Sequence, residues 1–286
     1  MHKILVLPGT KRIKRIEEFM KSNDFQIIRG SYTKIAFKVG NGDTRVLHDG
    51  IDIREFDFVW LTSTWSTRDL GYAVACYLDK YEVPHTRVEF ASSKLTDHMA
   101  FAISGLTQPH TFHAYSKYLI NNLEELEDFC GYPMVMKPKK GNGGKKTTLI
   151  NDRDELTTAV RGVKVKDFLF QEFIPNRFDW GINVADGNVV AASKRFRKAH
   201  GFLNNACQGA EEIFVELKEV PEEVRTYAKR AAKSLNLNWT RADIIYNDNT
   251  DDPTILELNR YPGMTVDSPE VNAFADFLDT RICLLD

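Results

Sequence analysis

Short apolar runs of strand length alternate with longer runs of helical spacing through the first 90 residues. The apolar positions of residues 4–7 (ILVL) and 57–62 (DFVWLT) are consecutive, which predicts buried strands. Residues 13–22 and 68–83 instead repeat apolar positions every three or four residues, which predicts helices. This order predicts a small α/β unit with a boundary near residue 90.

Two hairpins are indicated by two-residue turns between strand-like runs. Asn41-Gly42 separates residues 34–39 from residues 44–48, and Asp186-Gly187 lies at the centre of residues 181–196. Both dipeptides tolerate the positive φ that tight hairpin turns require. We therefore predict an antiparallel pair at each place.

After residue 90 the pattern changes to mixed helices and strands. Leu95, Met99, Ala102 and Ile103 share one face of a helix over residues 92–106, and Gly105 suits its end. The other predicted helices span 152–162, 221–235 and 268–282, and the other predicted strands span 132–138, 145–150, 167–174, 241–246 and 254–259. The order predicts α+β lobes after the first unit.

Polar residues interrupt the last two strands at matching positions. If residues 241–246 pair antiparallel with residues 254–259, Asp243 and Glu257 lie opposite each other and Asn259 follows on the same face. Like charges so placed repel, and two carboxylates with an amide form an oxygen set that suits Mg²⁺. A solvated polar face is the alternative. On either interpretation, neutralising Glu257 should leave the protein without nucleotide as stable as before, or more stable.

A basic, glycine-rich turn follows an apolar strand at residues 134–147 (MVMKPKKGNGGKKT). Lys137 ends the strand, and Gly141, Gly143 and Gly144 let backbone N–H groups converge on an anion, which suggests a phosphate cradle. The spacing is neither that of a P-loop nor that of a dinucleotide-binding fingerprint. An exposed loop is the alternative interpretation.

Composition places the chain among ordinary globular proteins. With 286 residues, 43% hydrophobic and 27% charged positions and a net charge of −2, it is large enough for two or three lobes, and any basic site must be local. Cys76, Cys130, Cys207 and Cys283 are far apart, which argues against a zinc ribbon or a disulfide framework. We find no secretory segment and no membrane span, and expect a cytoplasmic protein.

The order of these features along the chain resembles the ATP-grasp superfamily. Lys94 on a helix, Lys137 before a glycine loop, the strand FLFQEFI, and D…E-x-N followed by YPG occur in the order found there, in the branch of the RimK-like carboxylate–amine ligases. The resemblance covers roughly residues 90–265. It implies an α/β and α+β fold: an N-terminal α/β domain (1–90) before two α+β lobes (91–168 and 169–286) that clamp ATP.

The resemblance also implies the nucleotide contacts. Lys94 and Lys137 would contact ATP phosphates, and the loop with Gly141, Gly143 and Gly144 would close over them. The backbone of Glu172, Phe173 and Ile174 would meet the adenine, and Asp179 would hold the ribose hydroxyls. On the residues alone, Lys94 could be a solvated helix lysine, Glu172 an exposed strand end, and Asp179 a turn former or a salt-bridge partner.

The metal and transition-state residues follow from the same resemblance. Asp243, Glu257 and Asn259 would bind two Mg²⁺ ions, with Mn²⁺ as an alternative metal. Arg241 would stabilise the transition state, although an ion pair is the other interpretation. Arg195, in the basic run 194–198, would meet the γ-phosphate or an acidic substrate unless it is a solvated strand end.

Some residues depart from the family pattern or stay open. Gly181 stands where an arginine is common, Asn142 replaces a small hydroxyl residue, and residues 201–210 are less basic, so glutamate is not carried over as the amino substrate. Trp65 and Arg68 follow a predicted strand. They belong either to a plain loop or to acceptor recognition.

The implied reaction is ATP-dependent ligation of a carboxylate to an amine through an acylphosphate. Its substrates would be small molecules or peptides, and homo-oligomerisation is left open. A kinase-like phosphotransferase that uses the same nucleotide site is the first alternative. A nucleic-acid-binding module is the second, and the acidic cluster argues against it because a phosphate backbone repels carboxylates.

Overall fold

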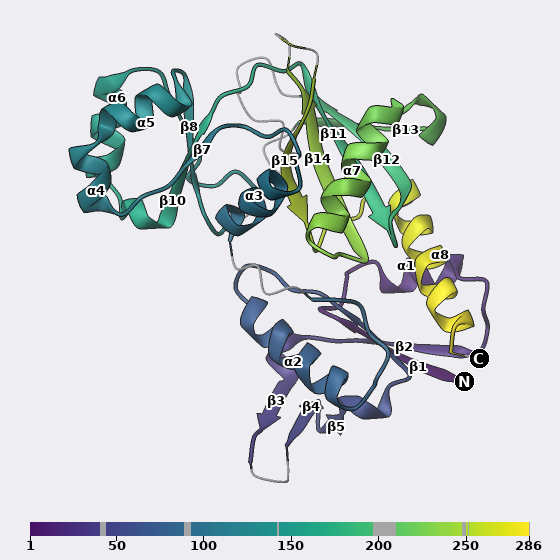
Figure 1. Ribbon diagram of the computed structural model, residues 1–286. Helices are drawn as coiled ribbons and strands as arrows, with labels where there is room; N and C mark the ends of the chain where they lie inside the picture. Colours follow the sequence, from purple (N-terminus) through teal and green to yellow (C-terminus); the bar gives the residue numbers. More distant parts are fainter. Residues whose placement is uncertain are drawn as a thin grey trace.

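The computed structural model describes residues 1–40, 44–88, 93–141, 143–196, 210–247, 250 and 252–285. These residues form four β-sheets, with an N-terminal unit below two further lobes in Figure 1. Asn41-Gly42, Asn142, Cys207 and the boundary predicted near residue 90 lie outside the described residues. No helix in the described part of the chain is long and apolar enough to span a membrane.

The N-terminal unit is built on a three-stranded parallel sheet of order β2-β1-β6. Its strands are β1 (His2–Leu7), β2 (Phe25–Arg29) and β6 (Phe58–Leu61), and its helices are α1 (Ile13–Phe19) and α2 (Arg68–Lys80). The predicted run ILVL is fully buried, as expected for a central parallel strand. Strand β2 was not predicted from the pattern.

A second small sheet of order β3-β4-β5 joins this unit, with strands β3 (Ile35–Lys38), β4 (Arg45–His48) and β5 (Ile51–Asp52). The antiparallel pairing of β3 with β4 confirms the first predicted hairpin. Short 3₁₀ turns occur elsewhere at Tyr32–Lys34, Ile53–Glu55, Val165–Asp167 and Leu217–Glu219.

The central lobe contains a four-stranded antiparallel sheet of order β7-β10-β8-β9. Its strands are β7 (Thr111–Phe112), β8 (Met134–Pro138), β9 (Thr148–Ile150) and β10 (Phe168–Glu172). Helices α4 (Ser116–Asn121), α5 (Leu123–Cys130) and α6 (Arg153–Arg161) form the outer end of this lobe (Figure 1). Buried Leu119, Leu126 and Phe170 join helices and sheet in one core.

The third lobe is a five-stranded antiparallel sheet of order β13-β12-β11-β14-β15. Its strands are β11 (Phe178–Ala185), β12 (Asn188–Phe196), β13 (Glu211–Val215), β14 (Trp239–Tyr246) and β15 (Pro253–Asn259). The second predicted hairpin is confirmed, because Ala185 pairs with Asn188 across a turn in which Asp186 and Gly187 have φ of 45° and 78°. Helix α7 (Glu222–Ser234) packs on one face of the sheet.

The last helix, α8 (Pro269–Cys283), returns to the N-terminal unit and packs beside α1 (Figure 1). The ring centroid of its Phe274 lies 4.8 Å from that of Trp60 on β6 and 4.9 Å from that of Trp239 on β14. One apolar core therefore spans the N-terminal unit, α8 and the end of the five-stranded sheet. This packing fixes the loop ends of β1 and β6 against the third lobe.

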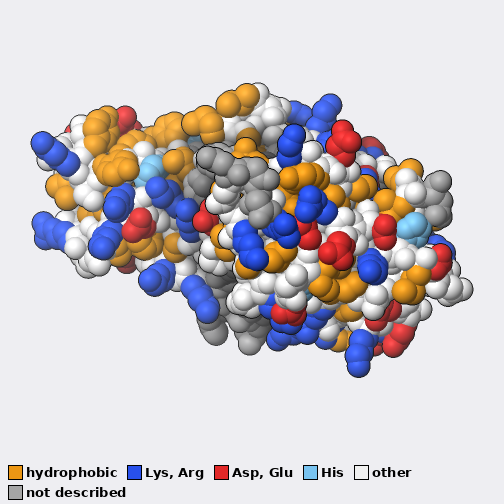
Figure 2. All heavy atoms as spheres, turned by 90° about the horizontal axis from the view of Figure 1, so that it is seen from below, with side chains coloured by type: hydrophobic (Ala, Val, Ile, Leu, Met, Phe, Trp, Pro, Cys, Tyr) orange, Lys and Arg blue, Asp and Glu red, His pale blue; other side chains and the backbone are white. Residues whose placement is uncertain are grey.

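Helix α3 (Lys94–Ile103) is buried on a different face from the apolar one that identified it. Met99 and Ile103 are 57% and 79% exposed, whereas Lys94, Asp97 and Phe101 are buried. The polar members of the buried face are paired, as burial of charge requires. Figure 2 shows the whole molecule from below, where basic and acidic side chains are interspersed among apolar ones on the surface.

Candidate functional site

A cavity of about 610 Å³ lies between the central lobe and the third lobe, with the loops after β1 and β6 on a further wall. All side chains and loop positions predicted from the sequence line this one cavity: Lys94, Lys137, Gly141, Gly143, Gly144, Glu172, Phe173, Ile174, Asp179, Arg195, Arg241, Asp243, Glu257 and Asn259. The structure therefore brings together residues as far apart in the sequence as Lys94 and Asn259. Their individual roles remain predictions.

The predicted pairing of the last two strands is confirmed. Asp243 and Glu257 are Cα partners across β14 and β15, and Asn259 Nδ2 donates a 2.9 Å hydrogen bond to Asp243 Oδ2. The register shifts directly after Asp243, so that Leu256 has no Cα partner in the ladder. Leu256 and Ile245 both line the cavity and supply apolar surface that the sequence did not single out.

Cationic side chains compensate the two carboxylates. Lys94 Nζ lies 2.5 Å from Glu257 Oε1, and Arg195 Nη2 lies 2.6 Å from Asp243 Oδ1. Asp243 Oδ1 nevertheless accepts no hydrogen bond of normal geometry from the described residues. A buried carboxylate oxygen in this state suits a metal ion, which would compete with these cations for the same oxygens.

Asp179 forms an ion pair within the cavity. Arg195 Nε donates to Asp179 Oδ1 and Arg195 Nη2 donates to Oδ2, both at 3.0 Å. Burial raises the pKa of Asp179, although the charge of Arg195 opposes the shift. The salt-bridge alternative left open by the sequence is thus the observed one, and contact with a ribose would require Asp179 to share its oxygens with Arg195.

Arg241 lies at the centre of a buried acidic cage. Its Nη1 donates to Glu270 Oε1 at 2.9 Å, and its Nη2 donates to Glu212 Oε1 at 2.6 Å and to Ser193 Oγ at 2.9 Å. The ion-pair alternative for Arg241 is therefore observed as well. A Cβ on Gly181 would lie 1.9 Å from Arg241 Nη2, which explains why glycine stands at a position where an arginine is common.

Sequence analysis missed both Glu212 and Glu270. Glu212 lies on β13, whose short alternating run was not predicted as a strand. Glu270 resembles an ordinary acidic residue in the first turn of a helix, where it complements the helix dipole. In the structure it is 1% exposed, and its pKa is raised by burial although Arg241 opposes the shift.

Lys137 and the three glycines of the predicted phosphate cradle line this cavity. Burial, reinforced by the charge of nearby Lys94, lowers the pKa of Lys137 to about 8. Gly141, Gly143 and Gly144 have φ of 150°, 67° and 68°, which favours glycine at each position. The loop can therefore turn its backbone in a way that other residues would resist.

The end of β10 forms the edge of the cavity next to the central lobe. The N–H of Glu172 donates to His110 O at 3.0 Å, and the N–H of Phe173 donates to Pro133 O at 3.2 Å. These two donors are engaged inside the protein. The predicted adenine contacts therefore depend on the carbonyl groups and on the N–H of Ile174.

The buried face of α3 makes ion pairs and hydrogen bonds with residues next to the cavity. Asp97 and Arg260 form a bidentate ion pair with 2.7 and 2.9 Å bonds, and both side chains are 3% exposed. His98 bonds to Gln108 and Gln171, and burial lowers its pKa to about 3, so that it is neutral at physiological pH. The signal for this face was the polar spacing of Lys94, Asp97 and His98, which share one side of a helix.

Residues of the N-terminal unit complete the cavity. Trp65 and Arg68, whose place the sequence left open, both line it, with the Arg68 guanidinium 4.5 Å from the Trp65 ring centroid. Arg12, in the loop after β1, also lines it and donates from Nε to Met264 O at 3.1 Å. A second substrate could meet the protein here.

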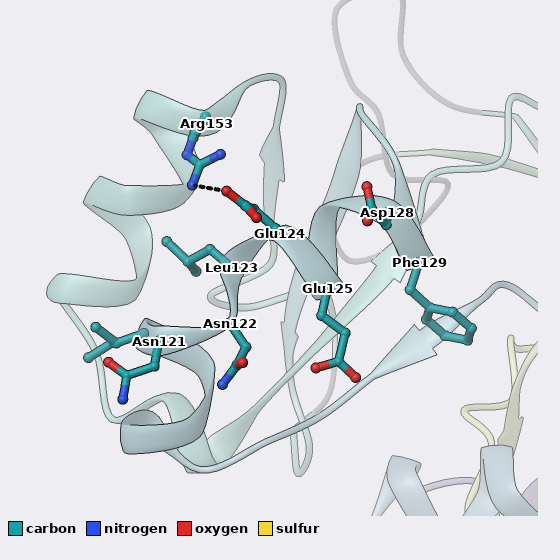
Figure 3. A pocket seen from close by; sticks show the side chains of 9 residues that line it. Asn121, Asn122, Leu123, Glu124, Glu125, Asp128, Phe129 and Arg153 are labelled. Carbon is teal, nitrogen blue, oxygen red and sulfur yellow. Dashed lines mark ion pairs between the residues drawn. The ribbon is translucent and has the colours of Figure 1, made fainter.

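A second cavity, of about 670 Å³, lies in the central lobe between α4, α5 and the start of α6 (Figure 3). Its lining includes Glu124, Glu125, Asp128 and Arg153, with Arg153 Nη2 3.7 Å from Glu124 Oε1. It contains none of the predicted site residues. The chemistry proposed below is therefore assigned to the first cavity.

The metal prediction concerns two carboxylates and one amide. Within the described residues, no group of three or more His, Cys, Asp and Glu side chains is placed to hold an ion. Asp243, Glu257 and Asn259 fit a Mg²⁺ ion that takes its remaining ligands from phosphate oxygens and water.

Comparison with known proteins gives the family. Residues 91–277 match the model of the RimK-like ATP-grasp domain. D-alanine–D-alanine ligase A of Clostridium perfringens is 31% identical over 182 residues, which cover 57% of this chain and 60% of the relative. D-alanine–D-alanine ligase of Bacillus anthracis is 26% identical over 151 residues, which cover 50% of this chain and 48% of that relative. The chain thus spans about half to 60% of the length of these curated relatives.

Solved structures agree in fold along the whole chain. The ATP-grasp ligase PsnB complexed with a minimal precursor has a TM-score of 0.71 and 18% identity, covering 98% of this chain and 99% of that chain. The Bacillus anthracis D-alanine–D-alanine ligase has a TM-score of 0.71 and 18% identity, covering 100% and 99%. Because the family model matches more than half of the chain, the protein belongs to the RimK-like ATP-grasp family.

Proposed function

We propose that this protein is an ATP-dependent carboxylate–amine ligase. The observation that carries the proposal is that one cavity is lined by a glycine loop with two lysines, by two carboxylates with an amide, and by a buried arginine. Phosphoryl transfer to a carboxylate needs these three elements: a phosphate cradle, a metal site and a stabiliser of developing negative charge. Family membership and the ligases of the same fold support it.

ATP would lie with its phosphates at Lys94, Lys137 and the glycine loop, and with its base at Ile174, Ile245 and Leu256. These three apolar side chains line the cavity. A planar base buries its faces favourably against such surfaces, while the nearby backbone supplies polar contacts to its edge. The domain limits proposed from the sequence, 91–168 and 169–286, would form the two sides of this cleft.

Two Mg²⁺ ions, or Mn²⁺ in their place, would be held by Asp243, Glu257 and Asn259 together with phosphate oxygens. Bound there, the ions would neutralise phosphate charge. Lys94 and Arg195, which now pair with Glu257 and Asp243, would then be released toward anionic groups. The same cations therefore serve the carboxylates before binding and the phosphates or substrate afterwards.

The reaction has two steps. A carboxylate oxygen of the acid substrate attacks the γ-phosphorus of ATP, the bond to ADP breaks, and an acylphosphate forms. An amine nitrogen then attacks the acyl carbon, phosphate leaves, the amine gives up a proton and an amide forms. Arg241, held by Glu270 and Glu212, would face the negative charge that develops on the acyl oxygen.

The test uses hydroxylamine as a general amine. The protein, Mg²⁺, ATP and a panel of carboxylic acids are assayed for ADP, inorganic phosphate and hydroxamate. A ligase gives all three in equal amounts with an accepted acid. The same mixture without hydroxylamine tests the kinase-like alternative, which a phosphorylated product accumulating with ADP over many turnovers would establish.

The substrates would be small carboxylates and amines, or peptides, in the cytoplasm. The structural relatives include a ligase complexed with a precursor peptide and a D-alanine–D-alanine ligase, so the panel should contain both amino acids and short peptides. Nucleic acid is not among the proposed partners, because Asp179, Asp243 and Glu257 line the same cavity as the basic residues. A homo-oligomer is an open possibility that light scattering would decide.

A further inference from the structure

One carboxylate of the large cavity has no part in the nucleotide and metal contacts proposed above. Asp243 and Glu257 are the proposed metal ligands, Asp179 is held in an ion pair, and Glu172 lies at the proposed adenine end. Among the described residues, the remaining carboxylate of the cavity lining is that of Glu212. It comes from β13, at the edge of the five-stranded sheet.

A network of hydrogen bonds holds the Glu212 carboxylate in one orientation. Glu212 Oε1 accepts from Arg241 Nη2 at 2.6 Å and from Ser193 Oγ at 2.9 Å, and the same arginine nitrogen donates to Ser193 Oγ at 2.9 Å. Glu212 Oε2, in contrast, accepts no hydrogen bond from any described residue. The carboxylate is therefore fixed through one oxygen and keeps the other for a ligand.

The charges around Arg241 do not balance. Its guanidinium also pairs with Glu270, with 2.9 Å between Nη1 and Oε1, so that one cation faces two carboxylates. Glu270 is 1% exposed and absent from the cavity lining, whereas Glu212 lines the cavity and its side chain is 17% exposed. The excess negative charge thus lies on the carboxylate that a substrate can reach. A largely buried charge of this kind favours a cationic partner.

Glu212 also lies where the second step of the reaction would take place. It is the Cα partner of Arg195 across β12 and β13, and it bonds directly to Arg241. In the reaction proposed above, these two arginines would face the transferred phosphoryl group and the acyl oxygen. An amine bound to Glu212 Oε2 would therefore lie beside the acylphosphate that it attacks.

We propose that Glu212 binds the reacting amine of the second substrate as an ammonium ion. This inference rests on the ligase function proposed above and assigns the group that recognises its nucleophile. The ammonium donates a charge-assisted hydrogen bond to Glu212 Oε2 and then passes one proton to it. The neutral nitrogen attacks the acyl carbon, the departing phosphate takes a second proton as the amide forms, and Glu212 returns its proton to solvent.

The test compares methylamine with hydroxylamine. The two are similar in size, but only methylamine is protonated at neutral pH. Amino acids and short peptides serve as further cationic amines. With ATP, Mg²⁺ and an acid accepted in the hydroxamate assay, product formation is measured over a range of amine concentrations. The quantity compared is the ratio of kcat/KM for each cationic amine to kcat/KM for hydroxylamine.

Glu212→Gln removes the charge and keeps an oxygen that can accept from Arg241 and Ser193. The ratio of kcat/KM should fall about tenfold or more, because a charge-assisted hydrogen bond to the ammonium is lost. Glu211→Gln is the matched control, since Glu211 is the exposed neighbour on the same strand and is absent from the cavity lining. Its ratio should equal that of the parent.

Glu270→Gln separates amine binding from the positioning of Arg241. Glu270 holds the same guanidinium from outside the cavity lining, so its loss should lower the rates with both kinds of amine and leave their ratio unchanged. Thermal unfolding checks that each variant folds. If Glu212→Gln does not, Glu212→Asp replaces it. That variant keeps the charge but withdraws it by one methylene, so the ratio should fall as well.

The outcomes separate this inference from the proposed function. If Glu212→Gln lowers the rates with hydroxylamine and with cationic amines by the same factor, Glu212 only holds Arg241 and the inference is wrong. It is also wrong if the parent accepts hydroxylamine but no cationic amine of the panel. Absence of hydroxamate in the parent with every acid would count against the ligase function itself.

Discussion

The guanidinium of Arg241 fills the space in which Gly181 lacks a side chain, since a Cβ on Gly181 would lie 1.9 Å from Arg241 Nη2. The neighbouring strands β11 and β14 place Gly181 opposite Asp243, so the arginine passes over the glycine to reach Ser193 on β12. The arrangement requires the smallest residue at this position. As a result, Asp243, the predicted metal ligand, and Arg241, the predicted stabiliser of the transition state, both pack against Gly181.

Gly181→Ala should therefore displace Arg241 from Glu270 and Glu212. We expect turnover to fall by about 100-fold or more, the range for removing one charge-stabilising donor, with less effect on ATP affinity. Steady-state kinetics and ATP titration provide the measurement. Gly162→Ala is the control, because a Cβ there would meet only atoms at 3.8 Å and should change neither quantity. Unchanged turnover in Gly181→Ala would separate Arg241 from the chemistry.

Glu257→Gln keeps the shape of the side chain and removes its charge. If Glu257 holds metal, turnover should fall by orders of magnitude. The structure also reverses the stability expected from sequence, because Glu257 pairs with the largely buried Lys94 rather than only repelling Asp243. We expect the variant without nucleotide to lose about 1–2 kcal/mol, as for a hydrogen bond to a charged group. Chemical denaturation measures this loss.

The control for that substitution is Glu216→Gln, which removes an equal charge from an exposed pair with Lys218. Its free energy of unfolding should stay within about 0.5 kcal/mol of that of the parent, and it should retain full activity. A Glu257→Gln protein that releases ADP at the parental rate would falsify the two-metal site. Stability equal to or above that of the parent would show instead that the Lys94 contact adds nothing.

Lys137 should make ATP binding depend on pH. Its pKa of about 8 in the free protein lies below the ordinary value of 10.5, and phosphate oxygens would raise it again. Below pH 8, Lys137 is protonated both in the free protein and in the ATP complex. ATP affinity should therefore be highest there and fall as pH rises through 8. Calorimetry near pH 8.5 in buffers of different ionisation enthalpy should detect proton uptake. Lys137→Met should abolish the uptake and weaken binding, and uptake that persists would assign it elsewhere.

Lys137 also has a predictable effect on the stability of the free protein. Because its folded-state pKa is depressed, the unfolded chain binds more protons between pH 8 and 10.5, and this group makes stability rise with pH in that window. Lys137→Met should remove that contribution. Denaturation midpoints of parent and variant across pH 7 to 10.5 would diverge least at the alkaline end.

The pair Asp97–Arg260 should be essential for the position of the loop after β15. Asp97→Asn removes the carboxylate charge that faces the buried guanidinium of Arg260, and breaking a fully buried pair costs about 3–5 kcal/mol. Urea denaturation should show the loss. Asp276→Asn, which breaks an exposed pair with Lys21, should cost less than about 1 kcal/mol. Equal small losses in both variants would show that Arg260 finds another partner.

Local signals in the sequence were sufficient to predict many helices and strands, and also the pairing of β14 with β15. The run ILVL, the Asp186-Gly187 turn and the register of Asp243 with Glu257 follow from side-chain period and turn chemistry, which act between residues close in sequence. The order of lysine, glycine loop and acidic strand also identified the family before any contact was known. Helices α4 and α5 and strands β2 and β13 were not predicted, because their apolar patterns are short and irregular.

Tertiary structure decided which partners the charged residues have. The sequence left open whether Asp179 forms a salt bridge and identified α3 by its apolar residues, whereas the fold pairs Asp179 with Arg195 and buries Lys94 and Asp97. Glu212 and Glu270 entered the site only through strands and helices that meet around Arg241. The physical reason is that a backbone pattern depends on neighbours along the chain, whereas a buried charge depends on whichever opposite charge the fold brings within a few ångströms.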